Sequence, residues 1–241
     1  MSARFENIRE TGSTNVDLLA RIAAGEQLGE GTWLIADRQR SGRGRQGRAW
    51  IDASGNFMGS TIVRLGDQDP PPPSLSLVAG LAVHEAVLAR LAAPHGLQLK
   101  WPNDLLLSGA KIAGILMDLT GNSAVVGIGV NLAAAPVLPD RAASSLATIG
   151  PAPDRDSFAR DLAAAFAREV ARWRQFGLEP IIARWLAAAH PQGSPLSVHG
   201  PDGARLGGTF DGLAPDGALR LRLADGSSRV IHAGDVALER N

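Results

Sequence analysis

One eight-residue segment, Ser-Gly-Arg-Gly-Arg-Gln-Gly-Arg at positions 41–48, concentrates residue types that suit the binding of a small anion. Glycine lets the main chain come close to a ligand and adopt positive φ angles. Arginine carries a permanent charge and a fork of donors that matches phosphate and carboxylate. The three arginines of the segment are Arg43, Arg45 and Arg48. The segment therefore predicts a loop that closes over a phosphate or carboxylate group.

The same segment also satisfies the dinucleotide fingerprint G-x-G-x-x-G, at Gly42, Gly44 and Gly47. That fingerprint requires a helix to begin at its end. Here residues 52–56 are typical of a turn and residues 57–63 of a strand, so the sequence excludes a Rossmann site. The Walker signature G-x-x-x-x-G-K-[ST] is also absent from the sequence, so ATP would not bind as it does in P-loop proteins.

Two further segments carry polar groups at the ends of predicted strands. Lys-Trp-Pro-Asn-Asp at 100–104 predicts a rigid turn that can direct Asn103 and Asp104 into a cleft, with a purely structural turn role as the alternative for Asp104. Lys111 begins a β run in which Gly114 leaves room for a ligand. Taken alone, a lysine at the start of a strand is a solvated edge charge. Glycines at 127 and 129 could mark a ligand's approach or only close packing.

The order and spacing of these segments, together with Ser13-Thr14-Asn15 near the N-terminus and Gly-Ile-Gly-Val-Asn at 127–131, resemble the biotin protein ligases. The resemblance covers nearly the whole chain. It implies that biotin is activated with ATP and Mg²⁺ to biotinyl-5′-AMP and transferred to one lysine of a biotin carboxyl carrier domain, in acetyl-CoA carboxylase or a related carboxylase. Transfer of lipoate or octanoate, the chemistry of the same superfamily, is the alternative.

The resemblance also implies roles for particular residues, while no residue is predicted to ligate a metal. The implied catalytic residues are Lys111, Arg45 and Asp104. The implied biotin-binding residues are Ser13, Thr14, Asn15, Gln39, Arg43, Gly44, Arg45, Lys111 and Gly114. The implied nucleotide-binding residues are Arg43, Arg45, Arg48, Trp50, Asn103, Lys111 and Asn131. Arg240 is not assigned to the predicted site.

Composition limits the other classes of function. The 241 residues include 24 basic and 24 acidic side chains, and the basic charge gathers at 38–48, which favours a local site over a nucleic-acid-binding face. The absence of cysteine excludes thiolate chemistry and fits a reducing cytoplasm. The five histidines are scattered, and no apolar run is as long as a membrane span. We expect a cytoplasmic monomer or weak homodimer that binds neither DNA nor membrane. DNA binding is not expected because only about a dozen residues precede Ser13, which is too few for a helix-turn-helix domain.

The sequence pattern predicts a mixed α/β fold. A mainly antiparallel sheet flanked by helices, like that of the class II synthetases, should occupy residues 1–190, and a small SH3-like β-barrel residues 191–241. Helices are expected from 13 or 14 to near 25, and at 75–92, 157–176 and 179–189. Strands are expected at 32–36, 57–63, 97–101, 105–107, 111–119, 123–130, 196–199, 204–210, 218–223, 228–232 and 235–238. Prolines 70–73 are interpreted as a rigid helix entry, with a polyproline ligand as the alternative.

Overall fold

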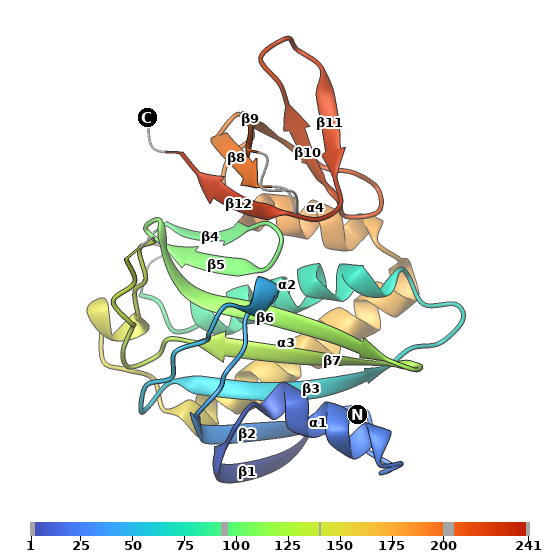
Figure 1. Ribbon diagram of the computed structural model, residues 1–241, viewed down its shortest axis with the longest axis vertical. Helices are drawn as coiled ribbons and strands as arrows, with labels where there is room; N and C mark the ends of the chain where they lie inside the picture. The colour runs from blue at the N-terminus through green and yellow to red at the C-terminus, as the bar shows by residue number, and fades with distance from the viewer. Residues whose placement is uncertain (1–2, 93–95, 140, 200–204, 240–241) are drawn as a thin grey trace.

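Two β-sheets organise the protein in the computed structural model, which describes residues 3–92, 96–139, 141–199 and 205–239 (Figure 1). The larger sheet has seven strands in the order β1-β2-β3-β7-β6-β5-β4. Their bounds are β1 Arg4–Thr11, β2 Thr32–Gln39, β3 Phe57–Arg64, β4 Leu97–Lys100, β5 Asp104–Leu107, β6 Ala110–Thr120 and β7 Ser123–Val130. All neighbours are antiparallel except β1 and β2, which confirms the mixed, mainly antiparallel sheet.

Strand β1 is the element that the sequence did not predict. Its residues, Arg-Phe-Glu-Asn-Ile-Arg-Glu-Thr, carry too many charges to be typical of a buried strand. It lies at the edge of the sheet, where the outer side chains stay in water, and pairs with β2 in parallel from Arg4 opposite Thr32 to Thr11 opposite Gln39. Helix α1, Thr14–Ala23, connects these two strands.

Helices cover both faces of the large sheet. Helices α2 (Leu75–Leu88), α3 (Arg155–Phe176) and α4 (Glu179–Ala188) lie on one face, and α1 lies on the other (Figure 1). Prolines 72 and 73 begin the short 3₁₀ turn Pro72–Ser74, which leads directly into α2. This placement favours the helix-entry interpretation of the proline run. Helix α2 ends at Leu88, four residues earlier than the sequence pattern predicted.

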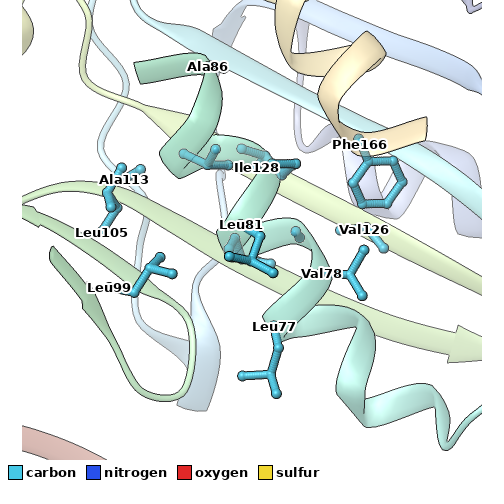
Figure 2. Close-up of a cluster of buried hydrophobic side chains, with 14 of the residues drawn as sticks. Leu77, Val78, Leu81, Ala86, Leu99, Leu105, Ala113, Val126, Ile128 and Phe166 are labelled. Atoms are coloured by element: carbon cyan, nitrogen blue, oxygen red, sulfur yellow. The ribbon is translucent and has the colours of Figure 1, made fainter. Parts of the chain in front are cut away.

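The main core lies between α2, α3 and the inner face of the sheet (Figure 2). In Figure 2, Val78 of α2 stands beside Val126 of β7, and Leu81 of the same helix lies below Ile128. The apolar stripe predicted on α3 is buried, because each of its five members is at most 5% exposed: Phe158, Leu162, Phe166, Val170 and Trp173. This layer holds the sheet rigid beneath the opposite face, on which the polar residues gather.

The smaller sheet has five antiparallel strands in the order β11-β10-β9-β8-β12. Their bounds are β8 Pro195–His199, β9 Arg205–Leu213, β10 Leu219–Arg222, β11 Ser228–Ile231 and β12 Asp235–Leu238. They match the five predicted strands, but the described residues show no pairing of β11 with β12 that would close a barrel. The large sheet lies before the predicted domain boundary at residue 190 and the small sheet lies after it. That the two parts are separate domains stays a prediction. Arg240 lies outside the described residues.

Candidate functional site

One pocket is lined by every residue for which the sequence predicted a functional role. It lies on the face of the large sheet that carries α1, and residues of β6, β7, the arginine loop and β12 also line it. The predicted residues found there are Ser13, Thr14, Asn15, Gln39, Arg43, Gly44, Arg45, Arg48, Trp50, Asn103, Asp104, Lys111, Gly114 and Asn131. The fold therefore brings together segments from 13 to 131. Their roles in binding and catalysis remain proposals.

The arginine loop forms a tight hairpin rather than the start of a helix. The N–H of Gly44 donates to the Arg48 carbonyl at 2.7 Å, and the N–H of Trp50 donates to the Gly42 carbonyl at 2.9 Å. A side chain at position 42 would lie 2.7 Å from the Trp50 carbonyl, so this position requires glycine. Strand β3 follows the loop, which supports the exclusion of a Rossmann site.

Polar groups of α1 and β2 form one end of the pocket. The N–H of Thr14 donates to Gln39 Oε1 at 2.8 Å, and the Thr14 hydroxyl oxygen lies 3.1 Å from the same atom. The Gln39 amide nitrogen consequently faces the loop, beside Gly42. Ser13 occupies the N-cap position of α1 but makes no side-chain capping bond. This end of the pocket therefore offers a hydroxyl and an amide N–H₂ group to a polar ligand.

The glycines of β7 make room for protein side chains. A Cβ at Gly127 would lie 2.2 Å from Asn15 Oδ1, and one at Gly129 would lie 2.4 Å from the Trp50 ring. Close packing thus accounts for both glycines, which was the second of the two interpretations drawn from the sequence. The indole of Trp50 lies over the sheet, and its N–H is buried without a hydrogen-bond partner among the described residues.

A largely buried charge cluster forms the other end of the pocket. Asp104 pairs with Lys111 at 2.6 Å and with Lys100 at 3.0 Å. Burial by itself would raise the pKa of the Asp104 carboxyl, but the two lysine charges outweigh it and hold this pKa below its ordinary value. Asp104 is thus ionised and fixes the ammonium group of Lys111. Lys111 is therefore not the solvated edge charge that its position alone suggested.

Two loop arginines contact the C-terminal sheet. Arg45 donates to the Asn103 side chain at 3.5 Å and to the Gly234 carbonyl at 3.2 Å, and Arg48 pairs with Asp235 of β12. Burial lowers the pKa of the Arg45 guanidinium, against the opposing charges of Asp235 and Asp104. Arg38 and Arg40 instead pair with Asp52 and Glu10, outside the pocket lining.

Several residues of the pocket lining were not predicted from the sequence. Ser60 comes from β3, Asp235 from β12, and Pro136, Leu138 and Arg141 from the irregular segment after β7. Backbone hydrogen bonds hold that segment beside Lys111: the Lys111 N–H donates to the Ala142 carbonyl at 3.0 Å, and the Ser144 N–H donates to the Lys111 carbonyl at 2.9 Å. An alanine- and proline-rich sequence carries no pattern that would reveal such pairing.

Comparison with known proteins identifies the class of this fold and pocket. Residues 11–133 match the biotin/lipoate A/B protein ligase family, and residues 197–238 match the biotin protein ligase C terminal domain. The chain therefore belongs to the biotin/lipoate A/B protein ligase family.

Within this family, the chain is similar over nearly its full length to proteins named as biotin ligases. The chain is 38% identical over 240 residues to a biotin--[acetyl-CoA-carboxylase] ligase of Paracoccus denitrificans, covering 95% of this chain and 98% of that one. It is also 38% identical over 237 residues to the ligase of that name from Mycobacterium tuberculosis, covering 97% and 88%. The fold matches a biotin protein ligase from Aquifex aeolicus in complex with biotin and ATP, with a TM-score of 0.85, 25% identity and 99% of both chains covered. Among the described residues, no helix is long and apolar enough to cross a membrane.

Proposed function

We propose that this protein joins biotin to ATP, forming biotinyl-5′-AMP and pyrophosphate, and then transfers the biotinyl group to a lysine of a biotin carboxyl carrier domain. The observation that carries the proposal is the division of the pocket into two ends. Hydroxyl and amide groups at the α1 end match a ureido ring, and the cluster of Arg45, Lys111 and Asp104 matches a carboxylate beside phosphates. Relatives with nearly the same length carry the name of this activity.

Biotin would lie along the sheet between the two ends. Ser13, Thr14 and Gln39 would hydrogen-bond its ureido group, and Asn15 would complete that end. The indole of Trp50 would supply an apolar surface for the bicycle. Arg43 and the backbone of Gly44 would direct the biotin carboxylate toward Lys111, whose side chain packs against Gly114 and leaves no open space there. Binding in this pose places the nucleophile of the first step beside fixed positive charge.

In the first step a biotin carboxylate oxygen attacks the α-phosphorus of ATP, and pyrophosphate leaves. Charge increases on the phosphate oxygens, so preorganised cations lower the barrier. Arg45 and Lys111 would contact the α-phosphate, and Arg43 and Arg48 the leaving pyrophosphate. Asn103, Asn131 and Trp50 would hold the nucleoside. ATP would bring Mg²⁺ mainly on its own phosphates, because the described residues hold no cluster of three metal-binding side chains. Asp104 would be one of the pocket's carboxylates available to that ion.

In the second step the amine of the carrier lysine attacks the biotinyl carbonyl carbon, and AMP leaves. The enzyme forms no covalent intermediate, which fits a chain without cysteine. The lowered pKa of the Asp104 carboxyl makes it a weak base. We therefore assign Asp104 to orienting Lys111 and the incoming amine rather than to proton removal.

The choice between biotin and lipoate is tested by calorimetry. The dithiolane ring of lipoate would offer no hydrogen-bond partner to the Ser13 hydroxyl or to the Gln39 amide N–H₂ group. Each lost hydrogen bond in a buried site costs on the order of 1–3 kcal/mol. Biotin should therefore bind far more tightly than lipoate or octanoate. Lipoate binding equal to or tighter than that of biotin would contradict the proposal.

We also propose that the protein works in the cytoplasm as a monomer or weak homodimer, without binding DNA. The balance of 24 basic and 24 acidic residues supports the absence of DNA binding, because it gives no broad positive field toward nucleic acid. Sedimentation velocity with and without duplex DNA tests the oligomeric state and the absence of DNA binding. A stable complex with DNA or a tight higher oligomer would contradict them.

A further inference from the structure

A chain of short hydrogen bonds runs from β6 into the α1 end of the pocket. Asn15 donates from Nδ2 to the Asp118 carboxylate at 2.8 Å and, at 3.4 Å, to the Leu116 carbonyl. The Ser60 hydroxyl donates to Asn15 Oδ1 at 2.5 Å. The hydroxyls of Ser60 and Thr14 lie 2.6 Å apart. Asp118 begins this chain but is not among the residues that line the pocket.

Asp118 gives the chain a direction. An ionised carboxylate only accepts hydrogen bonds, so the N–H₂ group of Asn15 must face Asp118 and its oxygen must face Ser60. Because Ser60 then uses its hydrogen on Asn15, the hydroxyl of Thr14 is the donor between Thr14 and Ser60. If the Asn15 amide were turned over, its oxygen would face the carboxylate and repel it. The position of one acidic residue thus fixes three polar side chains.

Burial makes this direction consequential. Thr14, Asn15 and Ser60 are at most 4% exposed, so water cannot easily replace a lost partner. Gly127 lies against the Asn15 amide. Any side chain at position 127 would clash with that amide, so the amide keeps its place only beside glycine. The buried amide can still change its donor pattern by turning over in place.

The direction matters for a ureido ring, which has one carbonyl acceptor and two N–H donors. Asn15 Oδ1 is an acceptor at the polar end of the pocket only while Asp118 holds the amide. We propose that Asp118 is a positioning residue for biotin recognition: it orients Asn15 so that an oxygen, and not an N–H₂ group, faces a ureido N–H. The proposal rests on the biotin ligase function proposed above and adds a residue that acts through Asn15.

Two variants of similar size test the proposal. Asp118→Leu removes the acceptor and lets the Asn15 amide turn over, whereas Asp118→Asn keeps an oxygen that can accept from Asn15. Loss of one buried hydrogen-bonding interaction predicts about tenfold weaker biotin binding for Asp118→Leu, measured by calorimetry. The KM for biotin should rise by the same factor, with kcat and the KM for ATP within about twofold of the parent. Asp118→Asn should recover biotin binding to within about threefold.

A double-mutant cycle separates this role from a general structural one. If Asp118 acts through Asn15, adding Asp118→Leu to Asn15→Ala should weaken biotin binding by less than about twofold further. Asp161→Ala, which removes a surface carboxylate paired with Arg90, is the control and should bind biotin like the parent. Parent-like biotin binding by Asp118→Leu, additive effects in the cycle, or an equal loss of ATP affinity would overturn the proposal. A parent protein that binds no biotin would instead contradict the ligase function itself.

Discussion

At the scale of single residues, the central feature is that Lys111 does not stand alone. Its ammonium group is fixed by Asp104, which Lys100 also contacts. The resemblance to the biotin protein ligases predicted that Lys111 and Asp104 belong to one site, whereas residue type and spacing alone did not. Their pairing could not be predicted, because it depends on how β5 and β6 align, with Leu106 opposite Lys111 and a register shift beside it.

Replacing Lys111 by alanine should lower the rate of biotin-dependent pyrophosphate release by a factor of about 100 or more, because a fixed charge at the reacting phosphate is lost. The sequence alone suggests no effect on folding, whereas the structure predicts a loss of about 1–2 kcal/mol in unfolding free energy, because largely buried Asp104 keeps only Lys100 as partner. Urea denaturation and a coupled pyrophosphate assay measure the two effects. Full activity of Lys111→Ala would show that Lys111 has only a structural role. Lys111→Arg is the control, because it keeps the positive charge.

At the scale of elements, the arginine loop is completed by a strand far away in the sequence. Glycine and arginine types predicted an anion-binding loop, and the structure places that loop in the pocket. Its contacts with Gly234 and Asp235 could not be predicted, because they join residues nearly 190 positions apart. Strand lengths elsewhere followed from apolar runs and turn dipeptides. Strand β1 was missed because its charged side chains belong to an edge strand.

Asp235→Ala should raise the KM for ATP by a factor of about five, while the KM for biotin changes little. The reason is that Arg48 loses its ion pair with Asp235, one of the contacts that hold its guanidinium at the pocket, and such a pair at a partly exposed site is worth up to about 1 kcal/mol. Glu239→Ala removes the exposed partner of Arg205 near the end of the same strand and serves as the control. Steady-state kinetics with ATP and biotin varied in turn measures the two KM values. An unchanged KM for ATP, or one raised equally in both variants, would show that the Arg48–Asp235 contact does not support nucleotide binding.

At the scale of the whole molecule, the two sheets share one hydrophobic core. Leu196, Phe210 and Val236 of the small sheet belong to the same buried cluster as the helices and the large sheet. The indole N–H of Trp101 also donates to the Gly217 carbonyl at 3.1 Å. His190 lies at this junction, directly after α4, with its ring 4.4 Å from the Phe210 ring.

The junction gives stability a dependence on pH. Burial, aided by the charge of Lys100, lowers the pKa of His190 from 6.5 to about 4. A base with a lowered pKa in the folded state contributes stability above pH 6.5 and loses it as the pH falls toward 4. Between pH 7.5 and 5 this residue should account for a loss of about 2 kcal/mol. His190→Phe keeps a ring against Phe210 and should remove that part of the loss in urea denaturation. An equally steep pH dependence in the variant would exclude His190 as its source.

The most direct test of the ligase function uses the complete reaction. The protein is incubated with biotin, ATP, Mg²⁺ and the biotin carboxyl carrier domain of an acetyl-CoA carboxylase, and the carrier is then analysed by mass spectrometry and peptide mapping. We expect the mass of one biotinyl group on one lysine, dependent on ATP and abolished when that lysine is replaced by arginine. An unmodified carrier, or a carrier modified with lipoate in preference to biotin when both acids are present, would contradict the proposed function.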